Sequence, residues 1–107
     1  MTTFDKREEG FEKRFAHDEE LKFKAAARRN KLLGQWAAEK LGLTGAEVDA
    51  YAKEVIAADF EEAGDEDVFR KLRKDFDAKG VKESDHQIRR TMQELMETAV
   101  AQIKAGT

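Results

Sequence analysis

The chain has 107 residues, enough for one small domain, with 40% hydrophobic residues, 40% charged residues and a net charge of −3. It has no proline, which allows long helices, and no cysteine, which excludes disulfides and thiolate metal sites. No apolar run approaches the ~20 residues that span a bilayer, and the N-terminus lacks the apolar core of a secretion signal, so we expect a cytoplasmic protein.

The first segment, FDKREEGFEKRF, combines dense charge with three phenylalanines. Phe4, Phe11 and Phe15 are seven and four residues apart, so on a helix they form one narrow apolar stripe. Gly10 costs a helix about 1 kcal/mol relative to alanine, and an isolated helix shorter than ~12–15 residues is marginal in water. We therefore predict that residues 1–17 form an arm that is mobile, or only partly helical, in the free protein.

A strong helix signal follows this arm. Asp18 and the two glutamates after it provide a cap and an acidic first turn, and Leu41-Gly42-Leu43 provides a glycine stop. One continuous helix from Thr3 to Leu41 is the alternative. The apolar residues of the predicted helix include Leu21, Phe23, Ala25, Ala26, Leu32, Leu33, Trp36 and Ala37.

Three more helices are predicted from their boundary residues and periodicity. The boundaries are Thr44 with Glu47 as a capping box, Asp65 as a cap, Gly80 as a stop, and Ser84 with Gln87 as a second capping box. The apolar faces are Val48, Tyr51, Ala52, Val55, Ile56 and Phe60; Val68, Phe69, Leu72 and Phe76; and Ile88, Met92, Leu95, Met96, Ala99 and Ile103. Since no segment of useful length alternates with period two, the sequence predicts an all-α fold, a four-helix bundle over residues 18–107 with a mobile N-terminal arm.

The large apolar residues fall into two groups, one expected in the core of the bundle and one on the arm. The core is expected to hold Leu33 and Trp36 with Tyr51, Phe60, Leu72 and Leu95. Four helices close a bundle without residues 1–17, so the arm's three rings are surplus to it. Surplus rings on a marginal helix indicate a segment that folds against a partner; packing of Phe11 and Phe15 on the bundle's own surface is the alternative.

Charge is distributed unevenly along the chain. Residues 21–40 carry six basic and one acidic residue, and residues 41–67 carry one basic and nine acidic residues. This alternation is typical of neighbouring helices with complementary solvated faces. Within the basic block, Arg28, Arg29 and Lys31 could instead meet phosphate groups, which makes them candidate nucleotide-binding residues on charge alone.

Other site chemistry has little support in the sequence. His17 and His86 are far apart and fit solvent-exposed positions near helix ends, with a proton switch as the alternative. The acidic cluster of Glu61, Glu62, Asp65, Glu66 and Asp67 lacks the spacing of a calcium loop and fits a charged connection between helices. There is no glycine-rich phosphate loop and no catalytic constellation, so no enzyme activity and no metal site are expected.

Long runs of the sequence resemble a known family. FAHDEE, KAAARRNKLLG and WAAEKLGL, followed by AYAKEVIAADFEEAGDEDVFRKL and the closing helix, are similar to the zeta subunits of alpha-proteobacterial ATP synthases, once known only as a domain of unknown function. The resemblance covers essentially the whole chain. It implies a non-catalytic four-helix bundle that regulates the F1 sector, the soluble catalytic part of the membrane-bound ATP synthase.

The resemblance also implies a mechanism. The N-terminal segment would enter F1 at a catalytic interface and block rotation in the direction of ATP hydrolysis, with the bundle remaining outside. The candidate anchors are Phe4, Phe11 and Phe15, and the candidate rim contacts are Asp5, Lys6, Arg7, Glu12, Lys13 and Arg14. No cofactor is required; ADP or ATP is a candidate weak ligand of the bundle, and neither nucleic acid nor membrane insertion is expected.

Two other functions are compatible with the residues. One is a helical binding module that responds to ADP or ATP, and the other is a general helical adaptor that uses the same arm. A hydrolysis assay with purified F1 separates inhibition from both.

Overall fold

The computed structural model describes residues 19–60 and 64–106, and every regular element in these ranges is an α-helix. The helices are α2 (Glu19–Lys40), α3 (Ala46–Ala58), α4 (Glu66–Lys79) and α5 (Asp85–Lys104). The predicted all-α four-helix architecture is therefore confirmed. The described part of α2 begins at Glu19; the predicted cap at Asp18 and the predicted arm lie outside the described residues, so the choice between this start and one helix from Thr3 stays a prediction.

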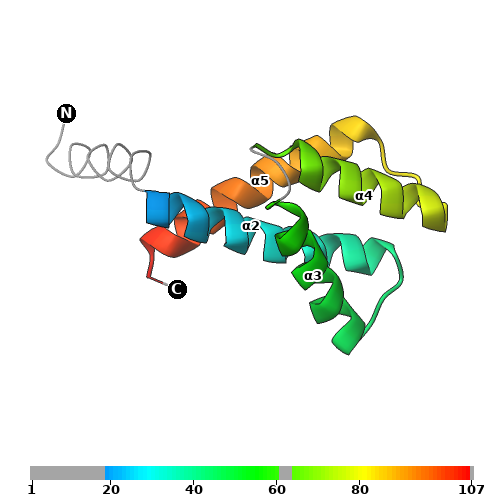
Figure 1. Ribbon diagram of the computed structural model, residues 1–107, viewed down its shortest axis with the longest axis horizontal. Helices are drawn as coiled ribbons and strands as arrows, with labels where there is room; N and C mark the ends of the chain where they lie inside the picture. Colours follow the sequence, from blue (N-terminus) through cyan, green and yellow to red (C-terminus); the bar gives the residue numbers. More distant parts are fainter. Residues whose placement is uncertain (1–18, 61–63, 107) are drawn as a thin grey trace, which may run out of the picture.

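The four helices close a bundle in which each contacts its neighbours along the chain (Figure 1). The two long helices, α2 and α5, lie alongside each other in opposite directions, and the shorter α3 and α4 pack against them and against each other. The first turns of α2 and the last turns of α5 lie together at one end of the bundle (Figure 1). None of the helices in the described ranges is long and apolar enough to cross a membrane.

Glycine stops end α2 and α4 as the sequence predicts. Gly42 and Gly80 have φ angles of 78° and 71°, the left-handed conformation that other residues rarely adopt. The residue after each glycine donates its N–H to a carbonyl five residues back, Leu43 to Ala38 at 2.9 Å and Val81 to Phe76 at 2.8 Å. These bonds satisfy carbonyl groups that a helix end otherwise leaves free.

The helix starts agree less well with prediction. The Gln87 N–H donates to Ser84 Oγ at 3.0 Å, which confirms the cap of α5. The capping box at Thr44 is wrong, because Gly45 occupies the cap position with φ 59° and the Thr44 backbone carbonyl, not its hydroxyl, accepts the Glu47 N–H at 3.2 Å. Asp65 stands at the cap of α4 but makes no capping bond; its carboxylate is bonded to an arginine of α2 instead.

The core lies between the four helices and contains most of the predicted apolar residues. Its buried members are Leu33, Ala37, Ala38, Tyr51, Val55, Val68, Phe69, Leu72, Phe76, Ile88 and Met92. Trp36 and Leu95 are only partly buried and pack against this cluster from its edge, where the Trp36 ring meets the Phe76 ring edge to face at 5.7 Å. The placement of Phe60 in the core is wrong: its ring is 66% exposed, because α3 ends at Ala58, two residues before it.

A glycine sets the distance between α2 and α3. A Cβ atom built on Gly34 would lie 2.5 Å from the Cα and 3.0 Å from the Cβ of Ala52 on α3. The two backbones therefore approach each other more closely than any residue larger than glycine at position 34 permits. Because Ala52 is itself small and buried, the approach is tight on both sides.

A polar contact joins α3 to α4 at the edge of the core. The Tyr51 hydroxyl donates to Asp75 Oδ2 at 2.7 Å, and Lys71 Nζ lies 3.0 Å from the same oxygen and 5.0 Å from the centroid of the tyrosine ring. Burial, together with the hydrogen bond to the Asp75 carboxylate, raises the pKa of Tyr51 far above its ordinary value. The tyrosine therefore remains a hydrogen-bond donor at pH values where a free tyrosine begins to ionise.

We expect Gly34→Ala to destabilise the protein. Alanine improves helix propensity by about 1 kcal/mol, but overpacking a close contact typically costs about 1–3 kcal/mol. A net loss of about 1 kcal/mol would lower the melting temperature by roughly 4–8 °C in a domain of this size. Adding Ala52→Gly should not restore stability, since the nearest atom is a backbone Cα. A single variant as stable as the wild type would mean that α2 and α3 separate freely.

We expect Tyr51→Phe to lower the free energy of unfolding by about 1.5 kcal/mol, the contribution typical of a hydrogen bond to a charged group. Urea denaturation at neutral pH measures this difference. The tyrosine of the unfolded chain ionises near its ordinary pKa of 10.0, whereas the folded one does not. The wild type therefore loses this part of its stability as pH rises above 10, and the difference from Tyr51→Phe should narrow there. A difference that widens at high pH would contradict this assignment.

Candidate functional site

The residues predicted to bind a partner precede the described part of the chain. They are Phe4, Asp5, Lys6, Arg7, Phe11, Glu12, Lys13, Arg14 and Phe15, and they lie outside the described residues. The described part of the chain begins at Glu19 in α2, so the predicted arm precedes the first described turn of this helix. The surroundings of that junction are the first candidate functional surface.

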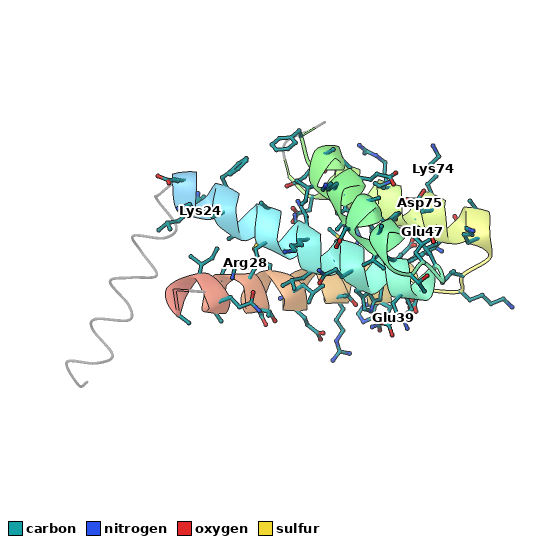
Figure 2. The ribbon with its side chains drawn as sticks, turned by 90° about the horizontal axis from the view of Figure 1, so that it is seen from below. Lys24, Arg28, Glu39, Glu47, Lys74 and Asp75 are labelled. Atoms are coloured by element: carbon teal, nitrogen blue, oxygen red, sulfur yellow. The ribbon has the colours of Figure 1, made fainter. Side chains whose placement is uncertain are left out.

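Basic side chains gather at this end of the bundle. Figure 2 labels Lys24 and Arg28 there, whereas Glu39, Glu47 and Lys74 lie toward the opposite end. Lys24 is exposed and pairs with Glu20 one turn earlier at 3.2 Å. Exposed pairs of this kind contribute little to stability, so both side chains remain available to a partner.

Arg29 occupies a different environment from its neighbours. Its side chain is only 2% exposed, and the guanidinium donates from Nε to Asn30 Oδ1 at 2.7 Å and from Nη2 to Asp65 Oδ1 at 3.0 Å. Asp59 Oδ1 lies 3.8 Å from the same Nη2, so two carboxylates face this one guanidinium. Asn30 Nδ2 in turn donates to Asp59 Oδ2 at 3.0 Å. This network holds α2 against both ends of the connection between α3 and α4.

The three candidate nucleotide-binding residues are therefore not brought together. Arg28 and Lys31 line one side of a groove of about 520 Å³ with Phe23, Ile56 and the end of α5. Arg28 Nη1 also donates to Gln102 Oε1 on α5 at 3.3 Å. Arg29 instead lines a cavity of about 280 Å³ on another face, with Arg89 and residues of α5. Any phosphate held by this segment would meet Arg28 and Lys31, with Arg29 engaged elsewhere.

Two exposed aromatic rings lie next to the basic groove. Phe23 is 57% exposed and Phe60 is 66% exposed, and their ring centroids are 5.9 Å apart. Sequence reasoning missed this pair, because both residues were assigned to apolar helix faces. The flanking residues gave no signal for Phe23: it stands between Lys22 and Lys24, but Leu72 stands between Lys71 and Arg73 and is fully buried.

Other titratable groups form ion pairs, some of them between helices. Arg89 of α5 donates two hydrogen bonds to the Glu66 carboxylate of α4, at 2.9 and 3.1 Å. Its guanidinium carbon lies 3.9 Å from the centroid of the Phe69 ring. The hydrogen bond from Arg89 holds the pKa of Glu66 below its ordinary value. His86 is exposed in the first turn of α5, and His17 lies outside the described residues.

The acidic cluster is also divided. Glu61 and Glu62 lie outside the described residues, whereas Asp65 bonds Arg29 and Glu66 bonds Arg89. In the part of the chain that the structure describes, no three histidine, aspartate or glutamate side chains gather as a metal site would require. The groups that the described surface offers to a ligand or partner are therefore exposed aromatic rings and charged side chains.

Comparison with known proteins agrees with the resemblance noted in the sequence. The family model described as ATPase inhibitor subunit zeta matches residues 1–102. A structure solved by solution NMR is 49% identical in sequence and has a TM-score of 0.72; the match covers 81% of this chain and 99% of that chain. No curated protein shows a sequence match.

The family match includes both the arm and the bundle. It extends from the first residue through nearly all of α5, so it covers almost the whole chain. A family of inhibitor subunits is regulatory and not catalytic, in keeping with the absence of a catalytic constellation from the sequence. The chain belongs to the ATPase inhibitor subunit zeta family.

Proposed function

We propose that this protein inhibits ATP hydrolysis by the F1 sector of the F1Fo-ATP synthase by inserting its N-terminal segment at a catalytic interface and blocking rotation. The observation that carries the proposal is the family match, which includes the phenylalanine stripe of residues 4–15. The described helices supply a second argument: they bury a continuous core among themselves. The rings of the arm are then available to a partner.

The proposal divides the chain into two parts with separate roles. Residues 1–17 are the inhibitory arm, and residues 18–107 are the bundle. Phe4, Phe11 and Phe15 act as apolar anchors against the walls of the F1 interface, and the charged residues between them meet its polar rims. If the arm is helical when bound, α2 continues it from Glu19, so the bundle stays outside the interface as a stop that limits insertion.

The site of action follows from the partner. F1 is the soluble part of a membrane-bound enzyme, so we place the protein in the cytoplasm and associate it with the membrane through F1 alone. Ordering a free arm on binding lowers the net affinity by several kcal/mol, which keeps inhibition reversible.

A second candidate function is a response to ADP or ATP. The observation that favours it is the groove of about 520 Å³, in which Arg28 and Lys31 lie near the exposed ring of Phe23. A ring offers a stacking surface to a base, and the two cations suit phosphate groups. In this role Arg29 supports the fold, because its guanidinium is already bonded to Asn30 and Asp65.

We expect Phe11→Ala and Phe15→Ala each to weaken inhibition of F1 hydrolysis by about thirtyfold, because truncating an interface hot spot typically costs about 2 kcal/mol or more. Titration of each variant against purified F1 measures the effect. Phe4→Ala is the matched control: it removes the same ring at the free end of the stripe, and its effect should be smaller. Melting temperatures should stay close to that of the wild type. Normal inhibition combined with early melting would assign the rings to the fold.

We expect Arg28→Gln and Lys31→Gln each to weaken ADP binding by about tenfold, equivalent to about 1.4 kcal/mol, with little change in melting temperature. Calorimetric titration of ADP measures the affinity, and Lys74→Gln at the far end of the bundle is the matched control. Arg29→Gln should instead lower the melting temperature, because it leaves the buried Asn30 side chain without its donor. Failure of the wild type to bind ADP would eliminate this candidate.

A further inference from the structure

We propose that the exposed ring pair of Phe23 and Phe60, with its basic rim of Lys24, Arg28 and Lys31, is a second docking surface, here called the aromatic surface. Through it the bundle contacts the outside of the F1 sector next to the point where the arm inserts. The surface that it fits is an apolar depression rimmed by carboxylates. This inference rests on the proposed function, and it concerns a contact that the arm does not make.

The exposure of the two rings is the first observation. Among the residues that the structure describes, Phe23 and Phe60 are the large hydrophobic side chains that remain exposed, at 57% and 66%. They come from two different elements, α2 and the turn after α3, yet their centroids are only 5.9 Å apart. Single exposed apolar residues are ordinary, but the convergence of these two on one spot is typical of an interaction site.

The surface is hollowed on both sides of Phe23. A shallow groove of about 150 Å³ lies between the two rings and is lined by Ala26, Ala27 and Ile56 together with the polar side chains of Asn30 and Asp59. The larger groove of about 520 Å³ shares Phe23, Ala27 and Ile56 and continues to Ile103 on α5. Rings that stand beside apolar grooves can interdigitate with a partner, as the anchor residues of protein interfaces do.

The charge of the rim indicates the chemistry of the partner. Lys24, Arg28 and Lys31 line the larger groove and come from three successive turns of α2. Of the acids near this rim that the structure describes, Glu20 pairs with Lys24 at 3.2 Å, and Asp59 accepts a hydrogen bond from Asn30 and lies 3.8 Å from the Arg29 guanidinium. Arg28 and Lys31 have no carboxylate partner within the described ranges, and these two cations favour a partner that presents carboxylates around its apolar contact.

The aromatic surface follows the arm closely in the chain, so it lies near the partner when the arm is bound. Phe23 is four residues after Glu19, which corresponds to about 6 Å along a helix at 1.5 Å per residue. When residues 1–17 are bound, the aromatic surface is held within reach of the same partner, while Lys74 lies toward the other end of the bundle (Figure 2). A tethered second contact forms at a high effective concentration, so a weak contact is enough to slow release.

A second copy of this chain is a poorer occupant. A stable dimer buries roughly 800 Å² on each partner, far more than two rings provide. In a twofold dimer the same patch also meets itself, so the basic rim would face an identical basic rim. Both arguments favour an acidic surface on F1.

The test compares the full-length Phe23→Ser/Phe60→Ser double variant with the wild type in the inhibition of purified F1. We expect the double variant still to inhibit fully at saturation, but with a half-inhibitory concentration about tenfold higher and correspondingly faster release. Its melting temperature should remain close to that of the wild type because both rings are mostly exposed. Phe23→Leu/Phe60→Leu, which keeps apolar groups at both positions, should retain most of the effect.

A charge variant tests the rim separately. Lys24→Glu should weaken inhibition several-fold at low salt and less at high salt, because exposed charges are screened. Lys74→Glu, which makes the same change at the far end, is the matched control and should inhibit as the wild type does. Equal effects of the two variants would indicate a dependence on net charge alone and would overturn the assignment of the rim.

The remaining outcomes separate this inference from the proposed function. If the wild type does not inhibit F1, the proposed function fails. If the wild type inhibits and the double serine variant inhibits equally well, the aromatic surface is not a docking site, whereas the proposed function stands. If the double serine variant loses inhibition only when ADP is present, the surface binds nucleotide. If the wild type sediments as a dimer and the variant as a monomer, the surface serves self-association. Either result overturns the inference.

Discussion

The close approach of α2 and α3 at Gly34 and Ala52 is the constraint on which the rest of the bundle depends. A Cβ atom at position 34 would lie 2.5 Å from the Ala52 Cα, so this crossing fixes the depth at which α3 sits on α2. That depth places Tyr51 and Val55 in the core and brings Tyr51 within 2.7 Å of Asp75 on α4. Phe60, two residues beyond the end of α3 at Ala58, lies beside Phe23 and not in the core.

The buried side chain of Arg29 is the second feature that organises the fold, and it does so through ion pairs and hydrogen bonds. Burying a charged group is costly unless it is paired and hydrogen-bonded. Arg29 meets this condition through Asn30, Asp59 and Asp65, which lie on α2 and at the two ends of the connection between α3 and α4. Both acids point to Arg29, whereas Arg28 and Lys31 have no carboxylate partner within the described ranges and line the groove beside Phe23.

One end of the bundle differs from the rest in its exposed ring and basic side chains. The end at which α2 begins carries the exposed ring of Phe23 and basic side chains, among them Lys24, which pairs with Glu20 at 3.2 Å. In the proposed function the described helices are the rigid body at the base of the arm. The aromatic surface proposed above lies on that body, close to the start of α2.

The sequence by itself determined the family, the four helices and several of their ends, because these depend on neighbours a few residues apart. Gly42, Gly80 and Ser84 act through bonds spanning three to five residues, which local patterns encode. Successive residues of a helix point about 100° apart, so adjacent Arg28 and Arg29 had to diverge. Which of them turns inward was decided by Asp59 and Asp65, 30 and 36 residues away in the chain. Only the tertiary structure could expose Phe60 and require a glycine at position 34, because both outcomes depend on how closely two helices pack.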